Sequence, residues 1–243
     1  MINIRKGVLT EIRKIMVVPS LNEGETLFSI PLVNAISKHF YISVILPEKL
    51  MELRRFFEVP LVFIPDNISI VKFIKIKGQY HYNKPDLLIL FDYKYLWALK
   101  RIFSPRFTLG VNGEEKINIV FKTGLQPLNQ KFERIVELLG INAKEIRFPI
   151  NRKRKTVFGI SLNDNAISVD GVKEIHTPND LGKISHLIAT KGRMAEIAYV
   201  EGKKLILLLR REDKFIPPED VRIVRYTGNL ETKTIERLIS EFE

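Results

Sequence analysis

The sequence contains no cysteine. This excludes disulfides, thiolate metal sites and thiol catalysis, and a cysteine-free, charge-rich chain is typical of the cytoplasm. No apolar run reaches the ~18–20 residues that a membrane-spanning helix needs. Residues 1–14, MINIRKGVLTEIRK, also lack the apolar core of about 7–15 residues that marks a signal peptide. We therefore expect a cytoplasmic protein.

Several common catalytic motifs are also missing. The chain has no G-x-G-x-x-G turn, no phosphate loop of the form G-x-x-x-x-G-K-[ST], no H-E-x-x-H and no G-x-S-x-G elbow. The histidines are scattered, and His176 and His186 do not have the spacing of metal ligands. We expect neither a metal ion nor a cofactor.

Acidic residues are scarce relative to basic ones, 28 against 39, which gives a net charge of +11. Such a balance favours an anionic partner, whether a nucleic acid, an acidic lipid or a phosphorylated small molecule. The densest basic run is NRKRK at 151–155. This run predicts a solvated linker between two domains. The alternative is a patch that binds nucleic acid or acidic lipid.

Short apolar runs alternate with helical patterns in the first part of the chain. The runs at 14–19, 41–47, 59–65 and 85–92 predict buried strands, and 105–111 and 117–122 predict two shorter ones. Helices are expected at 26–39, 48–57, 67–77, 93–103 and 126–141. This alternation indicates βαβ units and a parallel sheet.

The second part of the chain repeats the alternation on a smaller scale. We predict strands at 156–162, 172–176, 203–209 and 221–226, and helices at 178–190, 193–201 and 231–242. Polar strand-to-helix turns lie at 20–26 and 190–196, and ligands of open parallel sheets bind at the carboxyl ends of strands. The aromatic residues of the 93–103 helix, including Tyr95 and Trp97, have a spacing that favours core or interface packing over a stacking platform.

Several stretches resemble one known family. KIMVVPSLNEGETLFSIPLVNAISKHFYISVILPE resembles the start of the heptosyltransferase family of glycosyltransferases, with Gly24-Glu25 at the family's Gly-Asp place and Pro31 at its helix proline. KPDLLILFD and QKFERIVELLGI resemble later elements of its first domain. ATKGRMAEIAYVEGKKLILLL, at 189–209, resembles the donor-binding turn of the same two-domain architecture, called GT-B.

The resemblance implies an α/β protein with two Rossmann-like parallel-sheet domains. Residues 1–150 would form the acceptor-side domain and residues 151–243 a reduced donor-side domain, with the active site in the cleft between them. The implied activity is metal-independent transfer of a sugar from a nucleotide-diphosphate donor to a glycolipid or glycan acceptor of the cell envelope. A positively charged protein of this kind could also associate peripherally with the anionic inner face of a membrane.

The resemblance also assigns roles to individual residues. Glu25, in the turn made by Gly24, would be the general base. Donor binding would fall to the 190–196 turn, and the residues implied are Thr190, Lys191, Gly192, Arg193 and Glu196. From physics alone, Glu25 could instead be an acid that favours a helix N-terminus by ~0.3–1 kcal/mol, and Glu196 an ordinary surface residue.

Two other functions remain open at this stage. A relative that has lost catalysis could act as a binding or scaffolding module, because the second domain is short. A nucleic-acid binder could use NRKRK and the basic surface, although the chain has no recognition motif of that class. Binding of a nucleotide sugar would distinguish a glycosyltransferase from these two functions.

Overall fold

A computed structural model describes residues 11–22, 24–65, 74–78, 84–111, 119–121, 126–147, 156–162 and 169–241. The chain divides into two compact units. Unit 1 comprises Met1–Leu21, Ser29–Gln126 and Gln130–Arg147. Unit 2 comprises Asn22–Phe28, Pro127–Asn129 and Phe148–Glu243. Unit 2 is therefore built from three pieces of the chain, and the first of them begins at Asn22, shortly after β1 ends at Val18.

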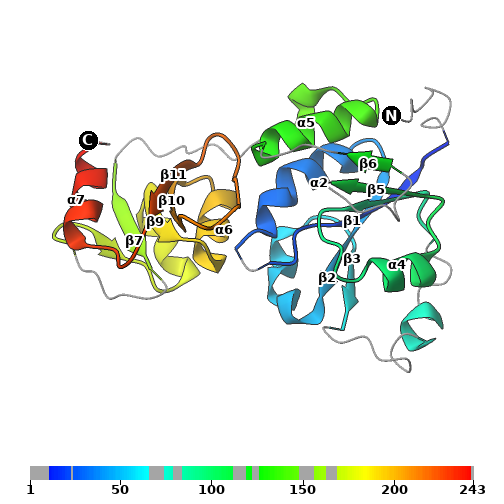
Figure 1. Ribbon diagram of the computed structural model, residues 1–243, viewed down its shortest axis with the longest axis horizontal. Coiled ribbons are helices and arrows are strands. Elements are labelled where there is room, and N and C mark those ends of the chain that lie inside the picture. The colour runs from blue at the N-terminus through cyan, green and yellow to red at the C-terminus, as the bar shows by residue number, and fades with distance from the viewer. Residues whose placement is uncertain are drawn as a thin grey trace. The chain divides into compact units, whose positions relative to one another are not determined.

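Unit 1 contains a six-stranded parallel sheet in the order β3-β2-β1-β4-β5-β6 (Figure 1). Its strands are β1 (Lys14–Val18), β2 (Tyr41–Pro47), β3 (Leu61–Ile64), β4 (Leu87–Leu90), β5 (Phe107–Val111) and β6 (Ile119–Phe121). Every residue of β4 is buried, as a strand covered on both faces requires. The predicted strands of the first part of the chain are confirmed.

The helices of unit 1 are shorter than the sequence pattern predicts. Among the described residues they are η1 (Leu27–Ser29), α2 (Ile30–Ser37), η2 (Glu48–Phe56), a helical stretch at 74–78, α4 (Leu96–Phe103), α5 (Leu128–Leu138) and η3 (Ala143–Glu145), of which η1 and α5 begin in unit 2. The α-helix expected from residue 26 begins only at Ile30, because Pro31 occupies its first turn. The helix expected at 48–57 is a 3₁₀ helix interrupted at Leu50.

Unit 2 contains a five-stranded parallel sheet in the order β11-β10-β9-β7-β8. Its strands are β7 (Phe158–Ser161), β8 (Lys173–Glu174), β9 (His186–Thr190), β10 (Lys204–Arg210) and β11 (Arg222–Tyr226). The helix predicted at 178–190 is wrong, since only η4 (Pro178–Lys183) is helical and β9 follows. Its apolar run is short and every residue of β9 is buried, a pattern that periodicity cannot separate from a buried helix.

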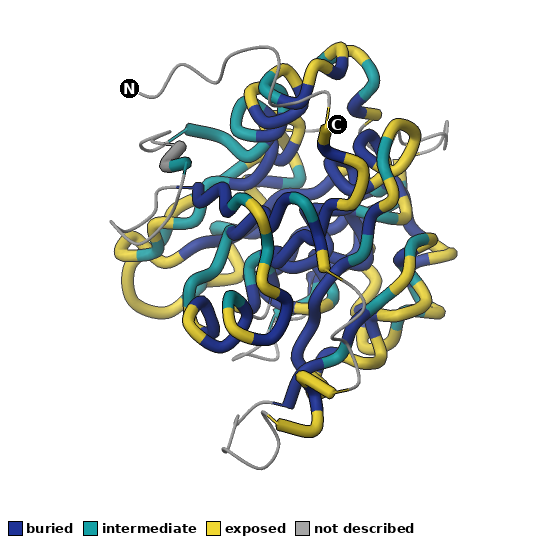
Figure 2. Tube along the Cα trace, turned by 90° about the vertical axis from the view of Figure 1, so that its right-hand side faces the viewer, coloured by how far each residue is buried: buried dark blue, intermediate teal, exposed yellow. Residues whose placement is uncertain are grey.

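Two α-helices complete unit 2, α6 (Arg193–Val200) and α7 (Thr232–Ser240). Ile235 and Leu238 of α7 join a cluster of buried side chains from β7, β9 and β10. Helix α6 contacts β9 and β10. In Figure 2 the buried segments, in dark blue, lie in the interior, and the exposed segments, in yellow, lie at the periphery. The sheet thus holds the first turn of α6 in a fixed place at the end of β9.

Some expectations lie outside the described residues. These are the basic run at 151–155 and most of the helix expected at 67–77, of which residues 74–78 are described and helical. Within the described part of the chain, no helix is both long and apolar enough to cross a membrane. In the same part, no group of three or more potential ligand side chains could hold a metal ion.

Candidate active site

The carboxyl edge of the sheet in unit 2 is hollowed. A cavity of 470 Å³ lies where Thr190 ends β9, Arg210 ends β10 and Tyr226 ends β11. A smaller cavity of 50 Å³ shares these three residues and extends to Leu162 and Asn229. Open parallel sheets bind their ligands at this edge. The hollow is therefore the candidate active site.

The larger cavity has a lining of mixed charge. Three cationic side chains contribute to it, Lys191, Arg210 and Lys214. Two carboxylates, Glu212 and Asp213, also line it. Lys191 and Asp213 pair with each other, so charges of both signs meet at this wall.

The 22–28 segment of unit 2 contacts the N-terminus of α6. Gly24 has a φ of +82°, and a Cβ built on it would lie 2.6 Å from the backbone nitrogen of Gly192. Only glycine accommodates both this backbone conformation and this approach. The two turns that the sequence marks, 20–26 and 190–196, therefore meet inside unit 2.

Two buried side chains anchor the segment. Leu27 and Phe28 are both fully buried. The Phe28 ring lies 4.8 Å from that of Tyr199 on α6 and 5.5 Å from that of Phe215, measured between centroids. Aromatic pairs at these separations add packing energy beyond burial alone. The segment is thus part of the hydrophobic interior of unit 2.

Glu196 provides the polar contact to the same segment. Its carboxylate Oε1 accepts a hydrogen bond of 2.6 Å from the backbone N–H of Leu27, and its side chain is buried. Burial raises the pKa of Glu196 to about 8, a rise that the backbone N–H groups of Leu27 and Gly24 only partly oppose. Glu196 therefore changes its protonation near neutral pH while holding residues 24–27.

Glu25 reaches the edge of the cavity through Lys191. The Lys191 ammonium lies 3.2 Å from Glu25 Oε1 and 2.7 Å from Asp213 Oδ2. Partial burial lowers the pKa of Lys191, but the two carboxylates outweigh this and raise it above its ordinary value. For Asp213, burial raises the pKa, but hydrogen bonds from Lys191 and from the Phe215 N–H outweigh this and hold the pKa of Asp213 below its usual range. Lys191 is therefore firmly charged and held by two acids.

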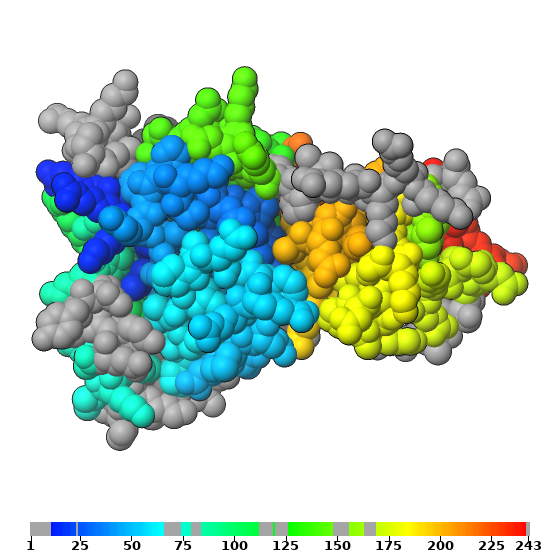
Figure 3. Space-filling view, turned by 180° about the vertical axis from the view of Figure 1, so that it is seen from behind, coloured from blue at the N-terminus to red at the C-terminus, as the bar shows by residue number. Residues whose placement is uncertain are grey.

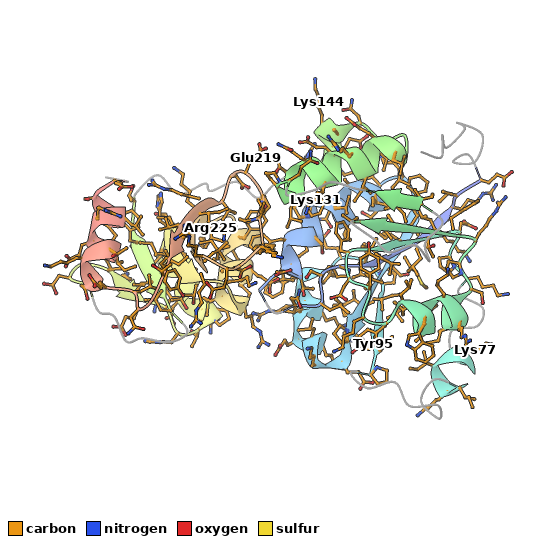
Figure 4. All side chains as sticks on the ribbon, viewed as in Figure 1. Lys77, Tyr95, Lys131, Lys144, Glu219 and Arg225 are labelled. Carbon is orange, nitrogen blue, oxygen red and sulfur yellow. The ribbon has the colours of Figure 1, made fainter. Side chains whose placement is uncertain are left out.

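Arg225 of β11 fixes the loop that carries Asp213. Its guanidinium donates to the backbone carbonyls of Arg210, Asp213 and Phe215. Figure 4 labels Arg225 within unit 2. The Lys191 ammonium also lies 5.6 Å from the centroid of the Phe215 ring, a cation–π distance. The loop therefore presents both a carboxylate and an aromatic face to one lysine.

The predicted site residues have different surroundings. Glu25 and Lys191 form an ion pair, and Thr190 lines both cavities. Glu25 is not in the first turn of α2, which contains no acid, so it does not serve the N-terminus of that helix. Arg193 is exposed at the first position of α6 and lines neither of these two cavities.

Sequence reasoning missed several residues of the site. Asp213, Arg225 and the anchors Phe28 and Phe215 had no motif to mark them. Only Asp213 could have been found from the sequence. It lies in RREDKF, which begins at the end of a predicted buried strand, where ligands of parallel sheets bind. Another cavity, of 290 Å³, lies in unit 1 at the amino ends of β1 and β2, the edge opposite to the one at which such folds bind ligands.

Comparison with known proteins gives one kind of match. No protein-family model matches the chain, and no curated protein matches its sequence. Solved structures do match. A glycosyl transferase family 9 protein from Veillonella parvula has a TM-score of 0.65 and 11% identity, covering 94% of this chain and 91% of its own.

Two enzymes of E. coli match equally well. Heptosyltransferase WaaC, solved with ADP-2-deoxy-2-fluoro heptose, has a TM-score of 0.64 and 9% identity, covering 95% of this chain and 100% of its own. ADP-heptose LPS heptosyltransferase II has a TM-score of 0.63 and 12% identity, covering 94% and 98%. The chain has the GT-B fold of the heptosyltransferases. This confirms the resemblance and the fold class at the level of architecture, with two parallel-sheet α/β units, and at this identity a GT-B fold does not by itself establish an activity.

Proposed function

We propose that this protein is a glycosyltransferase that moves a sugar from a nucleotide-diphosphate donor to an envelope glycolipid or glycan. The observation that supports this most is the pairing of Glu25 with Lys191 beside the 470 Å³ cavity of unit 2. A carboxylate that can accept a proton and a cation that can face a phosphate are then neighbours at the ligand edge of a GT-B fold.

The proposed donor site surrounds the start of α6. Gly192 lets backbone N–H groups approach a diphosphate, and the helix dipole favours the anion. Thr190 adds a hydroxyl, and Lys191 and Arg193 add positive charge. Arg210, which lines both cavities, extends the cationic surface across the ends of the strands. In this proposal Glu196 positions residues 24–27 and does not contact the sugar, because its carboxylate is buried against the Leu27 N–H.

In the proposed reaction, Glu25 is the general base. It takes the proton of an acceptor hydroxyl while that oxygen attacks the anomeric carbon of the donor. The bond between this carbon and the diphosphate oxygen breaks, and the nucleoside diphosphate leaves with the electron pair, so the configuration inverts. General base catalysis of this kind contributes ~10²–10⁴-fold. No metal takes part in the proposed step, and we place it on the cytoplasmic side of the envelope membrane.

Donor binding is the first test. A thermal-shift series with nucleoside diphosphates and nucleotide sugars at millimolar concentration should find a ligand that stabilises the protein, because a ligand bound to the native state adds RT ln(1+[L]/Kd). Arg210→Ala should weaken the shift, while Arg211→Ala, exposed at the next position and outside this cavity, should leave it unchanged. The absence of a shift with every nucleotide would contradict the proposal.

The role of Glu25 needs a separate measurement with the donor so identified. Glu25→Gln should retain donor binding and reduce sugar transfer by ~10²–10⁴-fold. Glu212→Gln, which changes another carboxylate of the cavity wall, should transfer at nearly the normal rate. Full activity of Glu25→Gln would remove this residue from the mechanism.

A further inference from the structure

We infer that Asp213 competes with the donor for Lys191, holding this lysine until a diphosphate takes its place. The inference rests on the proposed function, because it concerns the site at which we place the donor. It gives Asp213 the role of a positioning residue that limits the affinity of the site for diphosphates. We call Glu25, Lys191 and Asp213 the lysine cluster.

The ammonium of the lysine cluster has two anionic partners in the structure. Asp213 Oδ2 lies 2.7 Å from Lys191 Nζ, and Glu25 Oε1 lies 3.2 Å from the same atom. The shorter distance is that of a charge-assisted hydrogen bond. Together the two carboxylates occupy most of the donors of one ammonium group. A phosphate group that approaches Lys191 therefore competes with them.

The charges around the lysine cluster favour the withdrawal of one carboxylate. Three cations and two carboxylates line the 470 Å³ cavity, and Glu25 pairs with one of these cations. Once Glu25 is included, charges of the two signs are equal in number. A diphosphate beside both carboxylates of the lysine cluster would meet two like charges in a partly buried site, where charges interact strongly. Loss of one carboxylate from Lys191 removes part of this repulsion.

Asp213 is the carboxylate that can withdraw from Lys191. Its side chain is 21% exposed, against 13% for Glu25. Its other oxygen, Oδ1, accepts a hydrogen bond of 2.8 Å from the Phe215 N–H, so it keeps a partner when Lys191 turns away. Arg225 donates to the backbone carbonyls of Asp213 and Phe215 and holds the loop in place. The flexible side chain of Lys191 is therefore the part that moves.

Glu25 is held more firmly than Asp213. It follows Gly24, whose backbone packs against Gly192, and it precedes Thr26 and Leu27, which are fully buried. Glu25 thus stays beside Lys191 while the other partner of the ammonium changes. After sugar transfer, Asp213 would take Lys191 back from the nucleoside diphosphate and so favour release of this product.

Titration calorimetry of the full-length protein with inorganic pyrophosphate tests the competition. Asp213→Asn keeps an oxygen for the Phe215 N–H but loses the charge that holds Lys191. This variant should bind pyrophosphate about tenfold more tightly than the natural protein, since coupling between two ligands is typically on the order of 5–150-fold. An affinity that is unchanged or weaker would overturn the inference.

Glu241→Gln is the matched control for the change in net charge. Glu241 pairs with Arg222, is exposed, and lines neither cavity of unit 2. It directly follows α7, which Figure 3 shows in red at the surface of unit 2. This variant should bind pyrophosphate as the natural protein does. A gain equal to that of Asp213→Asn would assign the effect to net charge and overturn the inference.

A double-mutant cycle shows whether Asp213 acts through Lys191. Lys191→Met should weaken pyrophosphate binding, and adding Asp213→Asn to it should give no further gain, because the contested ammonium is gone. The same gain with and without Lys191 would mean that Asp213 acts only as a nearby negative charge, which contradicts the inference.

Sugar transfer provides a readout that a structural role would not move. Asp213→Asn should lower KM for the donor, and the nucleoside diphosphate product should inhibit this variant more strongly, by a factor similar to the gain in pyrophosphate affinity. A lower kcat with unchanged KM and unchanged product inhibition would show that Asp213 only supports the structure of the site.

Failure of this inference is distinct from failure of the glycosyltransferase proposal. If the natural protein transfers sugar and Asp213→Asn binds pyrophosphate no more tightly, the inference alone is wrong. If Asp213→Asn binds pyrophosphate more tightly but neither protein transfers sugar, the competition stands and the proposed function is wrong. If neither protein binds pyrophosphate or a nucleotide, both are wrong.

Discussion

After β1 the chain runs through residues 19–29, which include η1, before α2 begins at Ile30, whereas after β9 only Lys191 and Gly192 precede α6. Both turns join a buried parallel strand to a helix and contain a glycine, but only the longer one contains acids, among them Glu25. Because the turn after β9 is short, the N-terminus of α6 lies at the edge of the sheet of unit 2. The long turn instead packs residues 22–28 into unit 2. The longer turn therefore allows its acid, Glu25, to pair with Lys191 of unit 2.

The largest expected effect tests whether the 22–28 segment belongs to unit 2. Phe28→Ala removes a fully buried ring between Tyr199 and Phe215 and should cost about 3–5 kcal/mol. Hydrogen exchange of amides in α6 and β9 should accelerate, while β1 and β4 stay protected. Phe103→Ala, a fully buried ring of unit 1, should do the reverse. If Phe28→Ala accelerated exchange in unit 1 alone, the assignment of residues 22–28 to unit 2 would be wrong.

Next in size is the pH dependence of Glu196. Its pKa is raised to about 8, so between the unfolded value near 4.3 and pH 8 the folded protein holds a proton that the unfolded chain has released. The free energy of unfolding should therefore fall as pH rises, by roughly 1.4 kcal/mol for each pH unit in this window. Glu196→Gln, which cannot titrate, should lose this slope and be more stable than the natural protein at pH 8.

The control for this slope is Glu201→Gln, an exposed acid at the end of the same helix, which should keep it. Urea unfolding of the three proteins at pH 6, 7 and 8 provides the measurement. Identical slopes in the natural protein and Glu196→Gln would show that Glu196 does not titrate in the folded state.

A smaller effect isolates the contact between the two turns. Gly24→Ala introduces a side chain at a φ of +82° and within 2.6 Å of the Gly192 nitrogen, which should cost about 1–3 kcal/mol. Gly171→Ala has the same type of backbone, at +78°, with nothing within 4 Å. The difference between their unfolding free energies measures the close approach, and equal values would argue against it.

The smallest expected effect contrasts ion pairs of the two units. Arg106 and Glu11 of unit 1 form an ion pair in which both side chains are more than half exposed. Arg106→Gln should change the free energy of unfolding by at most about 1 kcal/mol, because water and salt screen such a pair. Lys191→Met should cost more, since it leaves two partly buried carboxylates facing each other. The same urea titration measures both, and the reverse order would contradict the contrast.

Local patterns were enough for most of the fold. The apolar runs at 14–19, 41–47 and 85–92 contain buried parallel strands, because a strand covered on both faces leaves a continuous apolar signature. The run ending at Thr190 is equally continuous and its pattern predicts a helix, and only its pairing with β7 and β10 makes it a strand. Such pairings are long-range contacts that no local window contains.

The candidate site was less accessible to prediction for the same reason. The sequence pattern predicts the two strand-to-helix turns at 20–26 and 190–196, and with them Glu25 and Lys191 as site residues. That Asp213 shares Lys191, and that Phe28 anchors the segment between two rings of unit 2, depends on residues more than one hundred positions apart or on a loop without a motif. Sequence identified the groups with chemistry but not the packing that brings them together.

The three-piece construction of unit 2 also affects how the protein is made. A ribosome releases residues 22–28 long before residues 148–243, with which they pack. Leu27 and Phe28 must therefore remain without their native neighbours while most of the chain is synthesised, and unit 2 can complete its interior only near the end of translation. Biosynthesis thus makes the segment that carries Glu25 one of the first to emerge and one of the last to reach its final place.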